Sequence, residues 1–274
     1  LYQKNMKYCA FLLFLLLYSC GSIKIKELKN DYTQPLIGKV KSINATIYEY
    51  QIVKNDTTVW SKNHFMEFDN NNHLIKEVKT SEEDITELNY KYNTVGLLIE
   101  LTSPQDRNNY KTIYTYDNNQ NCIEEKAFNN NKIFHVITKV FDKNNNVVEE
   151  KRTFFGEMSQ KIKNSINYKE KTILNEKKLD TIYGIVLKTK MKFNKKGYIT
   201  RTGTLKENTP NNFDQYQFDS ADNLLQKTTH YSDGTIKETF SFQNTYDKKG
   251  NIMTRKKFYN GKLVGKTTFD ITYW

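Results

Sequence analysis

The chain has few of the residues that cross-link or interrupt a fold. Its 274 residues include three cysteines and three prolines. Cys9 and Cys20 both lie in the N-terminal apolar segment, which leaves Cys122 alone in the remaining chain and excludes an internal disulfide there. We expect Cys122 to be a small core residue rather than a reactive thiol, because it occupies an apolar repeat position. Pro104 and Pro210 fall in polar stretches that we expect between strands.

Arginine is also scarce, although the net charge is +11 and remains +9 without residues 1–19. Nearly all of the positive charge is lysine; the arginines are Arg107, Arg152, Arg201 and Arg255. Specific recognition of bases and phosphates favours arginine forks, and the scattered lysines form no nucleic-acid motif. We therefore expect solvated lysine faces and no nucleic-acid partner. Attraction to acidic lipid headgroups or polysaccharide stays open.

Motifs for common catalytic chemistry are missing. The sequence has no nucleophile elbow, paired-histidine zinc motif, phosphate loop or dinucleotide fingerprint. The four histidines are scattered, and the Asp/Asn-rich turns lack the spaced carboxylates of a calcium loop. Carboxylates such as Glu124, Glu149 and Glu176 recur with the repeat, unlike a unique catalytic pair. We expect no metal, no cofactor and no catalytic residue.

The dominant feature is a pattern that occurs eight times: an aromatic residue, Asp or Asn, a polar turn and an aliphatic pair. The intervals between successive aromatic anchors are 24 to 28 residues, which is typical of a repeat architecture. The anchors are Phe68, Tyr92, Tyr116, Phe141, Tyr168, Phe193, Phe218 and Tyr246.

The residues that follow each anchor predict a tight hairpin. In seven repeats the next residue is Asp or Asn, whose side chain can bond the backbone two residues further on. The fourth position favours Gly, Asn or Asp, which tolerate a left-handed backbone, and the sixth is always apolar. The fifth repeat, at Tyr168, has lost the turn residues; the alternative is an irregular insert between Phe141 and Phe193.

Alternating polar and apolar residues between the turns predict strands, as in the stretch from Lys266 to Tyr273. Asn260-Gly261 and Asp233-Gly234 are further hairpin signals. We expect an all-β fold over residues 36–274: an antiparallel meander of about eight repeated hairpins that forms a long curled or partly rolled sheet.

Three of the repeats carry a resemblance to a known family. They begin at Tyr116-Asp117, Phe141-Asp142 and Tyr246-Asp247, and each continues through a polar turn into an aliphatic pair. This pattern resembles the YD repeats of the RHS family. Large RHS proteins resemble shells around a toxin; the resemblance here covers about residues 64–260, without a self-cleavage motif or toxin domain.

The N-terminal segment predicts export. Lys7 precedes a short apolar run from Tyr8 to Tyr18, which has the layout of a secretory signal and is too short to span a membrane. The run ends at Leu17-Tyr18-Ser19-Cys20-Gly21, which resembles the lipobox of bacterial lipoproteins. The resemblance implies a signal peptide at 1–19, acylation of Cys20, and a polar tether at 20–35 that holds the protein at the outer membrane or cell envelope.

The sequence therefore favours a non-enzymatic envelope lipoprotein that presents a repeat β surface to a protein or glycan partner. Tyr110, Tyr114 and Tyr216 are candidate binding residues, because exposed tyrosines can stack on sugar rings; alternatively they only pack the sheet. Two other hypotheses remain: a glycan-acting hydrolase with an unrecognised carboxylate pair, and a remnant of an RHS-type toxin-delivery shell.

Overall fold

The computed structural model describes residues 23–26, 36–53, 56–81, 84–104, 109–179, 186–206 and 209–274. Within these ranges the chain forms strands and turns, with no helix. The strands are β1 (Val40–Val53), β2 (Asp56–Phe68), β3 (Leu74–Thr80), β4 (Ile85–Tyr92), β5 (Leu98–Ser103), β6 (Tyr110–Tyr116), β7 (Cys122–Asn129), β8 (Lys132–Phe141), β9 (Val147–Phe154), β10 (Glu157–Asn167), β11 (Thr172–Leu179), β12 (Val186–Phe193), β13 (Ile199–Lys206), β14 (Thr209–Phe218), β15 (Leu224–His230), β16 (Ile236–Tyr246), β17 (Ile252–Tyr259) and β18 (Lys262–Tyr273).

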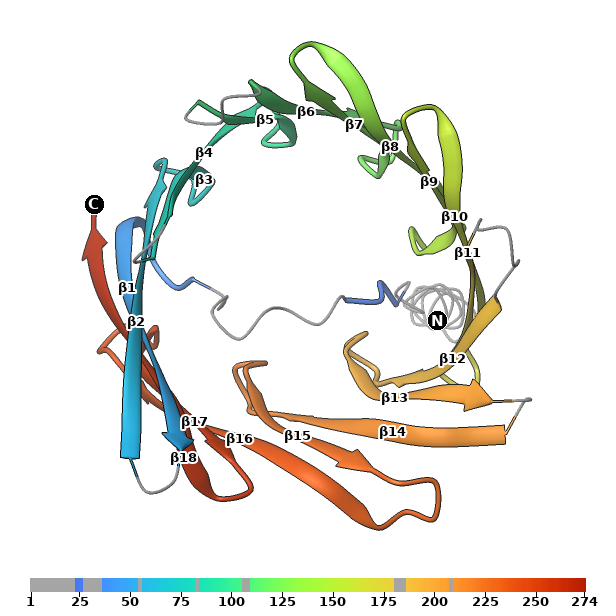
Figure 1. Cartoon of the computed structure of the whole chain (residues 1–274). Helices are drawn as coiled ribbons and strands as arrows, with labels where there is room; N and C mark the ends of the chain where they lie inside the picture. Colours follow the sequence, from blue (N-terminus) through green and yellow to red (C-terminus); the bar gives the residue numbers. More distant parts are fainter. Residues whose placement is uncertain are drawn as a thin grey trace, which may run out of the picture.

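The strands form a closed antiparallel meander barrel (Figure 1). Each strand pairs with the next along the chain, and β1 also pairs with β18 from Val40↔Tyr273 to Glu49↔Gly265. The all-β meander is thus confirmed, but the expected curled or partly rolled sheet is wrong because the sheet closes. Closure depends on β1, which precedes the first repeat and supplies the missing partner for β18. A closed ring has no unpaired sheet edge.

The repeat turns have the predicted hairpin geometry. At Asp69, one carboxylate oxygen accepts hydrogen bonds from the backbone N–H groups of Asn71 and His73, both at 2.8 Å. Asn72 then adopts a left-handed conformation with φ 62°, and a bulge places Phe68 opposite Leu74. Seven repeats share the left-handed residue at the fourth position: Asn72, Gly96, Gln120, Asn145, Gly197, Asp222 and Gly250.

The fifth repeat is a hairpin rather than an irregular insert, but its turn is tighter. Asn167 pairs directly with Thr172, so the loop consists only of residues 168–171. The left-handed residue is Lys171, with φ 54°, instead of the expected Thr172. Loss of the turn aspartate therefore shortens the loop and leaves the β10–β11 pairing intact.

The opposite rim carries the other predicted hairpins. Asn260 and Gly261 both have positive φ, 46° and 81°, as a two-residue hairpin turn requires. The turn at Asp233 ends on Gly234, with φ 89°. Pro210 departs from expectation: it is the second residue of β14 and faces Leu205 close to the hairpin end.

The outer face of the barrel carries exposed lysine side chains on β10 and β12. The segment of residues 23–26 lies inside the ring (Figure 1), and its Ile25 shares a cavity with Asn164 and Met191, which defines the inner face. Side chains alternate along a strand, so the adjacent Lys163 and Lys190 are on the outer face, where both are exposed. The outer face of β10 and β12 is therefore polar and charged.

Apolar packing concentrates in two clusters on the inner face. One lies where β1 closes the ring and consists of Val40, Ile43, Ala45, Phe68, Ile252 and Phe269. The other lies across the ring, receives Ile23 and Ile25 from the N-terminal segment, and consists of Ile173, Phe193 and Ile199. The N-terminal segment is thus part of the packed structure of the inner face.

A glycine allows the N-terminal segment to approach the wall closely. Gly197 has φ +85°, and a Cβ atom there would lie 2.0 Å from the backbone oxygen of Lys24. The N–H of Lys26 donates a hydrogen bond of 2.9 Å to the oxygen of Gly197. Only glycine meets both the backbone conformation and the contact at this position.

Candidate functional site

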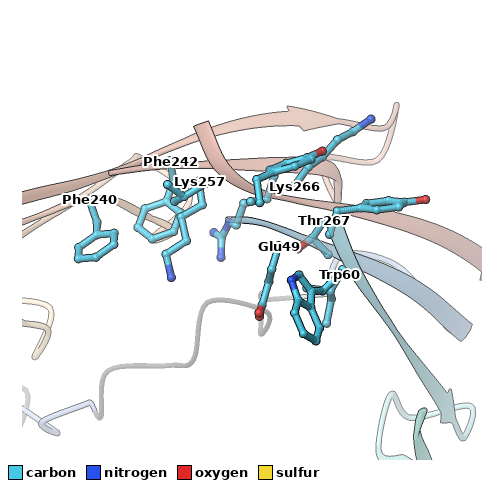
Figure 2. A pocket seen from close by; sticks show the side chains of 13 residues that line it. Glu49, Trp60, Phe240, Phe242, Lys257, Lys266 and Thr267 are labelled. Carbon is cyan, nitrogen blue, oxygen red and sulfur yellow. The ribbon is translucent and has the colours of Figure 1, made fainter. Parts of the chain in front are cut away.

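A cavity of about 470 Å³ opens on the barrel where β16, β17, β18, β1 and β2 meet (Figure 2). Part of its lining is one row of cross-strand neighbours. Trp60 pairs with Glu49, Glu49 with Gly265, Gly265 with Lys257, and Lys257 with Phe242. Directly paired residues of antiparallel strands project from the same face, so the row lines one side of the sheet. It combines aromatic rings with both signs of charge.

Gly265 forms the hollow in the middle of this row. Glu49 and Lys257 both pair with Gly265, which has no side chain to fill the space between them. A glycine inside a strand often marks a place where a ligand can approach the backbone. The space above Gly265 is therefore bordered by a carboxylate and an ammonium group.

The aromatic walls of the cavity differ in exposure. Trp60 is 50% exposed, whereas Phe242 is buried. The charged groups lie against the rings: Lys257 Nζ is 5.2 Å from the ring centre of Phe240, and the Arg255 guanidinium is 5.4 Å from that of Phe242. Lys257 and Arg255 thus make cation–π contacts with the two phenylalanine rings, whereas half of the Trp60 surface remains exposed to solvent.

A second cavity, of about 740 Å³, lies between the N-terminal segment and β6–β13. Ile25, Ile173 and Met191 supply apolar lining. Lys139 also lines it and forms an ion pair of 2.5 Å with Glu125 of β7. This cavity is partly covered by the protein's own N-terminal segment, since Lys24, Ile25 and Lys26 line it.

The structure does not bring the three candidate tyrosines together. Tyr110 and Tyr114 project from the same face of β6, whereas Tyr216 lies on β14. All three are half-buried rather than exposed. The hydroxyl of Tyr110 is 3.0 Å from that of Thr112, and burial raises the pKa of Tyr114 and of Tyr216. None of the three lines the cavity at Gly265.

One pair of carboxylates lies close together on the inner face. The hydroxyl of Thr229 is 2.7 Å from Asp214 Oδ1 and 3.3 Å from Glu238 Oε1. Each carboxylate has a further partner: Lys227 is 3.1 Å from Asp214, and the hydroxyl of Tyr259 is 3.3 Å from Glu238. Neither acid lines the cavities described above.

A buried carboxylate joins β2, β3 and β4. Glu77 lies 2.5 Å from His64 Nε2, 2.6 Å from the Tyr90 hydroxyl and 3.0 Å from Lys79 Nζ. Burial alone would raise the pKa of Glu77, but the hydrogen bonds from these three groups outweigh it and lower the pKa to about 2. These contacts make Glu77 a structural ion rather than a proton donor at neutral pH.

Several other expectations concern single residues. Burial raises the pKa of the Cys122 thiol, which is half-buried and free.

Among the described residues no cluster of three His, Cys, Asp or Glu side chains could hold a metal. In the same ranges no helix is long and apolar enough to cross a membrane. The expected signal peptide and the acylation site Cys20 lie outside the described residues.

No protein-family model matches the chain, and no curated protein matches it. Solved structures with a similar arrangement include a porin-like protein from Bacteroides uniformis, with 11% identity and a TM-score of 0.44 over 89% of this chain and 100% of that chain. A porin-like protein from Bacteroides vulgatus has 11% identity and a TM-score of 0.35 over 86% and 98%. The Tc holotoxin pore of Photorhabdus luminescens has 12% identity and a TM-score of 0.39 over 73% and 12%.

Sequence reasoning missed the row around Gly265. Two signals were present: Trp60 is one of only two tryptophans, and Gly265 interrupts an otherwise regular strand pattern. Neither signal identifies the partners, because the row joins Glu49 and Lys257, which are 208 positions apart in the sequence. Only the closure of the barrel brings them to opposite sides of the same glycine.

Proposed function

We propose that this protein is a non-enzymatic, lipid-anchored envelope protein that binds a glycan in the cavity at Gly265. The observation that carries the proposal is the half-exposed ring of Trp60 beside Glu49 and, across Gly265, Lys257. An aromatic face stacks on the apolar face of a sugar ring, and a carboxylate and an ammonium group hydrogen-bond its hydroxyls. The cavity offers all three groups within one row.

The outer face supports a barrel that lies in water. A barrel embedded in lipid presents an apolar band outward. Here β10 and β12 present exposed lysines instead, at Lys163, Lys190 and Lys192. Burying such charges in hydrocarbon is costly, so we infer that the protein is attached beside the membrane rather than inserted in it.

The position of the N-terminal segment supports attachment through Cys20. Ile23 contacts the turn at Asn146 and lies only three residues after Cys20. Three residues span at most about 11 Å. Acylation of Cys20 would therefore hold the rim that carries the repeat turns toward the membrane, and the opposite rim away from it.

Tryptophan fluorescence tests the glycan proposal directly. In a Trp274→Phe variant, Trp60 is the only tryptophan of the chain. Titration with soluble oligosaccharides from peptidoglycan and from envelope polysaccharides should then change the emission in a saturable way. Trp274 is itself exposed and outside the cavity, so its removal is the matched control and should leave the affinity unchanged.

Calorimetry with the same oligosaccharides provides the second measurement. Trp60→Ala should weaken binding roughly fivefold to tenfold, since an aromatic contact contributes up to about 1.5 kcal/mol beyond its buried area. Glu49→Ala should also weaken binding, because it removes the carboxylate that pairs with Trp60 across the strands. Equal affinities of the wild type and both variants would contradict the proposed site.

Glycan hydrolysis is a second candidate because of Asp214 and Glu238. Both carboxylates contact the hydroxyl of Thr229 and so lie within about 6 Å of each other, in the range of glycosidase pairs. Their separate partners, Lys227 and Tyr259, argue for a structural role. Release of reducing ends from a labelled oligosaccharide by the wild type, and its loss in Asp214→Asn, would favour hydrolysis over binding alone.

A further inference from the structure

Three repeat turns build the same three-residue arrangement. In each, the hydroxyl of a tyrosine contacts the aspartate of the preceding repeat turn. In two of the three, the tyrosine also accepts a hydrogen bond from the asparagine four residues after that aspartate. In the third, this asparagine donates to the same aspartate. We call these arrangements the turn triads. They are Asp142–Asn146–Tyr168, Asp219–Asn223–Tyr246 and Asp247–Asn251–Tyr273.

The first triad holds an extended stretch of main chain. Asn146 Oδ1 accepts a hydrogen bond of 2.6 Å from the N–H of Ile25, and its Nδ2 donates one of 2.7 Å to the oxygen of Ile23. The hydroxyl of Tyr168 accepts from the same Nδ2 at 2.8 Å. The tyrosine thus orients the amide so that it pairs with a peptide backbone.

The last triad repeats this chemistry with another part of the chain. Asn251 Oδ1 accepts a hydrogen bond of 2.7 Å from the N–H of Ile37, and Nδ2 donates one of 2.8 Å to the oxygen of Ile37. Tyr273 accepts from Nδ2 at 2.7 Å. Asn251 is fully buried by this contact and by the surrounding cluster. In both triads the asparagine side chain is hydrogen-bonded to the N–H and C=O groups of a main chain that contains isoleucine.

The middle triad has the same groups but holds no main chain from the described residues. Asn223 Nδ2 contacts Asp219 at 3.1 Å, and the Tyr246 hydroxyl contacts the same carboxylate at 2.8 Å. Asn223 Oδ1 accepts no hydrogen bond from any described residue. Tyr246 is 43% exposed, whereas Tyr168 and Tyr273 are half-buried.

We propose that the Asp219–Asn223–Tyr246 triad is a docking position for an extended, aliphatic segment of another polypeptide. Asn223 would pair with the N–H and C=O groups of the guest main chain, as Asn146 and Asn251 do with Ile25 and Ile37. Leu224, at the repeat position that Ile199 and Ile252 hold in the two apolar clusters, would contact its aliphatic side chain. The partner class is a polypeptide because an amide side chain matches the donor and acceptor of a peptide group.

The probe is the protein's own docking sequence supplied as a separate molecule. A fluorescein-labelled peptide of residues 22–27, Ser-Ile-Lys-Ile-Lys-Glu, is titrated into the full chain and followed by anisotropy. One equivalent should bind to the wild type. Asn223→Ala should abolish binding, and Tyr246→Phe should weaken it about fivefold to tenfold because the hydroxyl no longer orients the triad.

Two controls test whether the triad and the main chain are what matter. Asn121→Ala alters a buried asparagine at the same turn position, but the next anchor is Phe141, which has no hydroxyl; binding should be unchanged. A peptide N-methylated at the second isoleucine keeps its side chains and loses the N–H donor, so it should fail to bind. Thermal unfolding checks that each variant is folded, and Asn223→Asp removes the donor while preserving the size of the side chain.

Several results would overturn the proposal. The first is that the peptide does not bind, and the second is that the N-methylated peptide binds equally well. The third is that Asn146→Ala loses binding while Asn223→Ala keeps it, because the peptide would then be displacing the protein's own N-terminal segment from Asn146. The glycan proposal is tested independently: Trp60→Ala should leave peptide binding unchanged, and Asn223→Ala should leave the Trp60 fluorescence response unchanged.

Discussion

Asn251 donates a hydrogen bond of 2.7 Å to the hydroxyl of Tyr273, the last residue of the last strand. Tyr273 also contacts Asp247, so the end of β18 is tied to the turn before β17. Burial raises the pKa of Tyr273, and its hydrogen bond to Asp247 raises it further. Tyr273 is therefore a ninth anchor of the repeat, and it engages the preceding turn as Tyr168 and Tyr246 do.

We expect Tyr273→Phe to destabilise the barrel by about 1–2 kcal/mol, because it removes the hydrogen bonds of the hydroxyl to buried Asn251 and to Asp247. Tyr259→Phe is the matched control: its hydroxyl contacts Glu238 at 3.3 Å on an exposed part of β17, and the loss should be below about 0.5 kcal/mol. Chemical denaturation measures both. Equal free energies of unfolding for the two variants would contradict a closing role for Tyr273.

The left-handed turn residue gives a second prediction. Gly250 has φ +95°, and a Cβ atom there would lie 3.1 Å from Ile37 Cδ1, so Gly250→Val should cost about 1–3 kcal/mol. Thr172→Val is the comparison, because Thr172 begins β11 and Lys171 takes the left-handed conformation instead. It should change stability by less than about 0.5 kcal/mol. An unchanged denaturation midpoint for Gly250→Val would show that this turn tolerates a β-branched residue.

The turns could be predicted from the sequence because their chemistry is local. Asp69 and Asn72 are three residues apart, and the side-chain bonds and left-handed backbone of such a turn depend only on neighbouring residues. The tighter fifth turn was not predicted, since spacing alone placed the left-handed residue at Thr172 rather than Lys171.

Closure and the cavity could not be predicted in this way. The pairing of Ala45 with Phe269 joins strands from opposite ends of the chain, and no repeat pattern marks β1 as the partner of β18. The cavity depends on the register of five strands around Gly265. A shift of one residue would turn Trp60 and Glu49 to the outer face.

Acylation at Cys20 is a third prediction. Cys20→Ala should leave an unprocessed precursor that incorporates no labelled palmitate, because no other cysteine follows a suitable apolar run. Cys122→Ala is the control and should incorporate palmitate like the wild type, since Cys122 belongs to β7. Labelled palmitate in Cys20→Ala would show that the anchor is elsewhere.

The last prediction concerns acid stability and rests on Glu77. Burial raises the pKa of Glu77, but the hydrogen bonds from His64, Tyr90 and Lys79 lower it by more. The net effect in the folded protein is a pKa lowered from 4.5 to about 2. The unfolded chain therefore binds this proton more readily. The stabilisation, on the order of 3 kcal/mol, is present above about pH 4.5 and is lost as the pH falls toward 2.

Glu77→Gln should remove this part of the acid transition. The variant should be less stable than the wild type at pH 7, and the difference should shrink between pH 4.5 and 2 as the wild-type carboxylate is protonated. Glu176→Gln breaks an exposed ion pair with Lys188 at 3.2 Å and should have little effect at either pH. Free energies of unfolding measured by urea denaturation across this range decide the matter: a constant difference between wild type and Glu77→Gln would mean that Glu77 does not titrate with the fold.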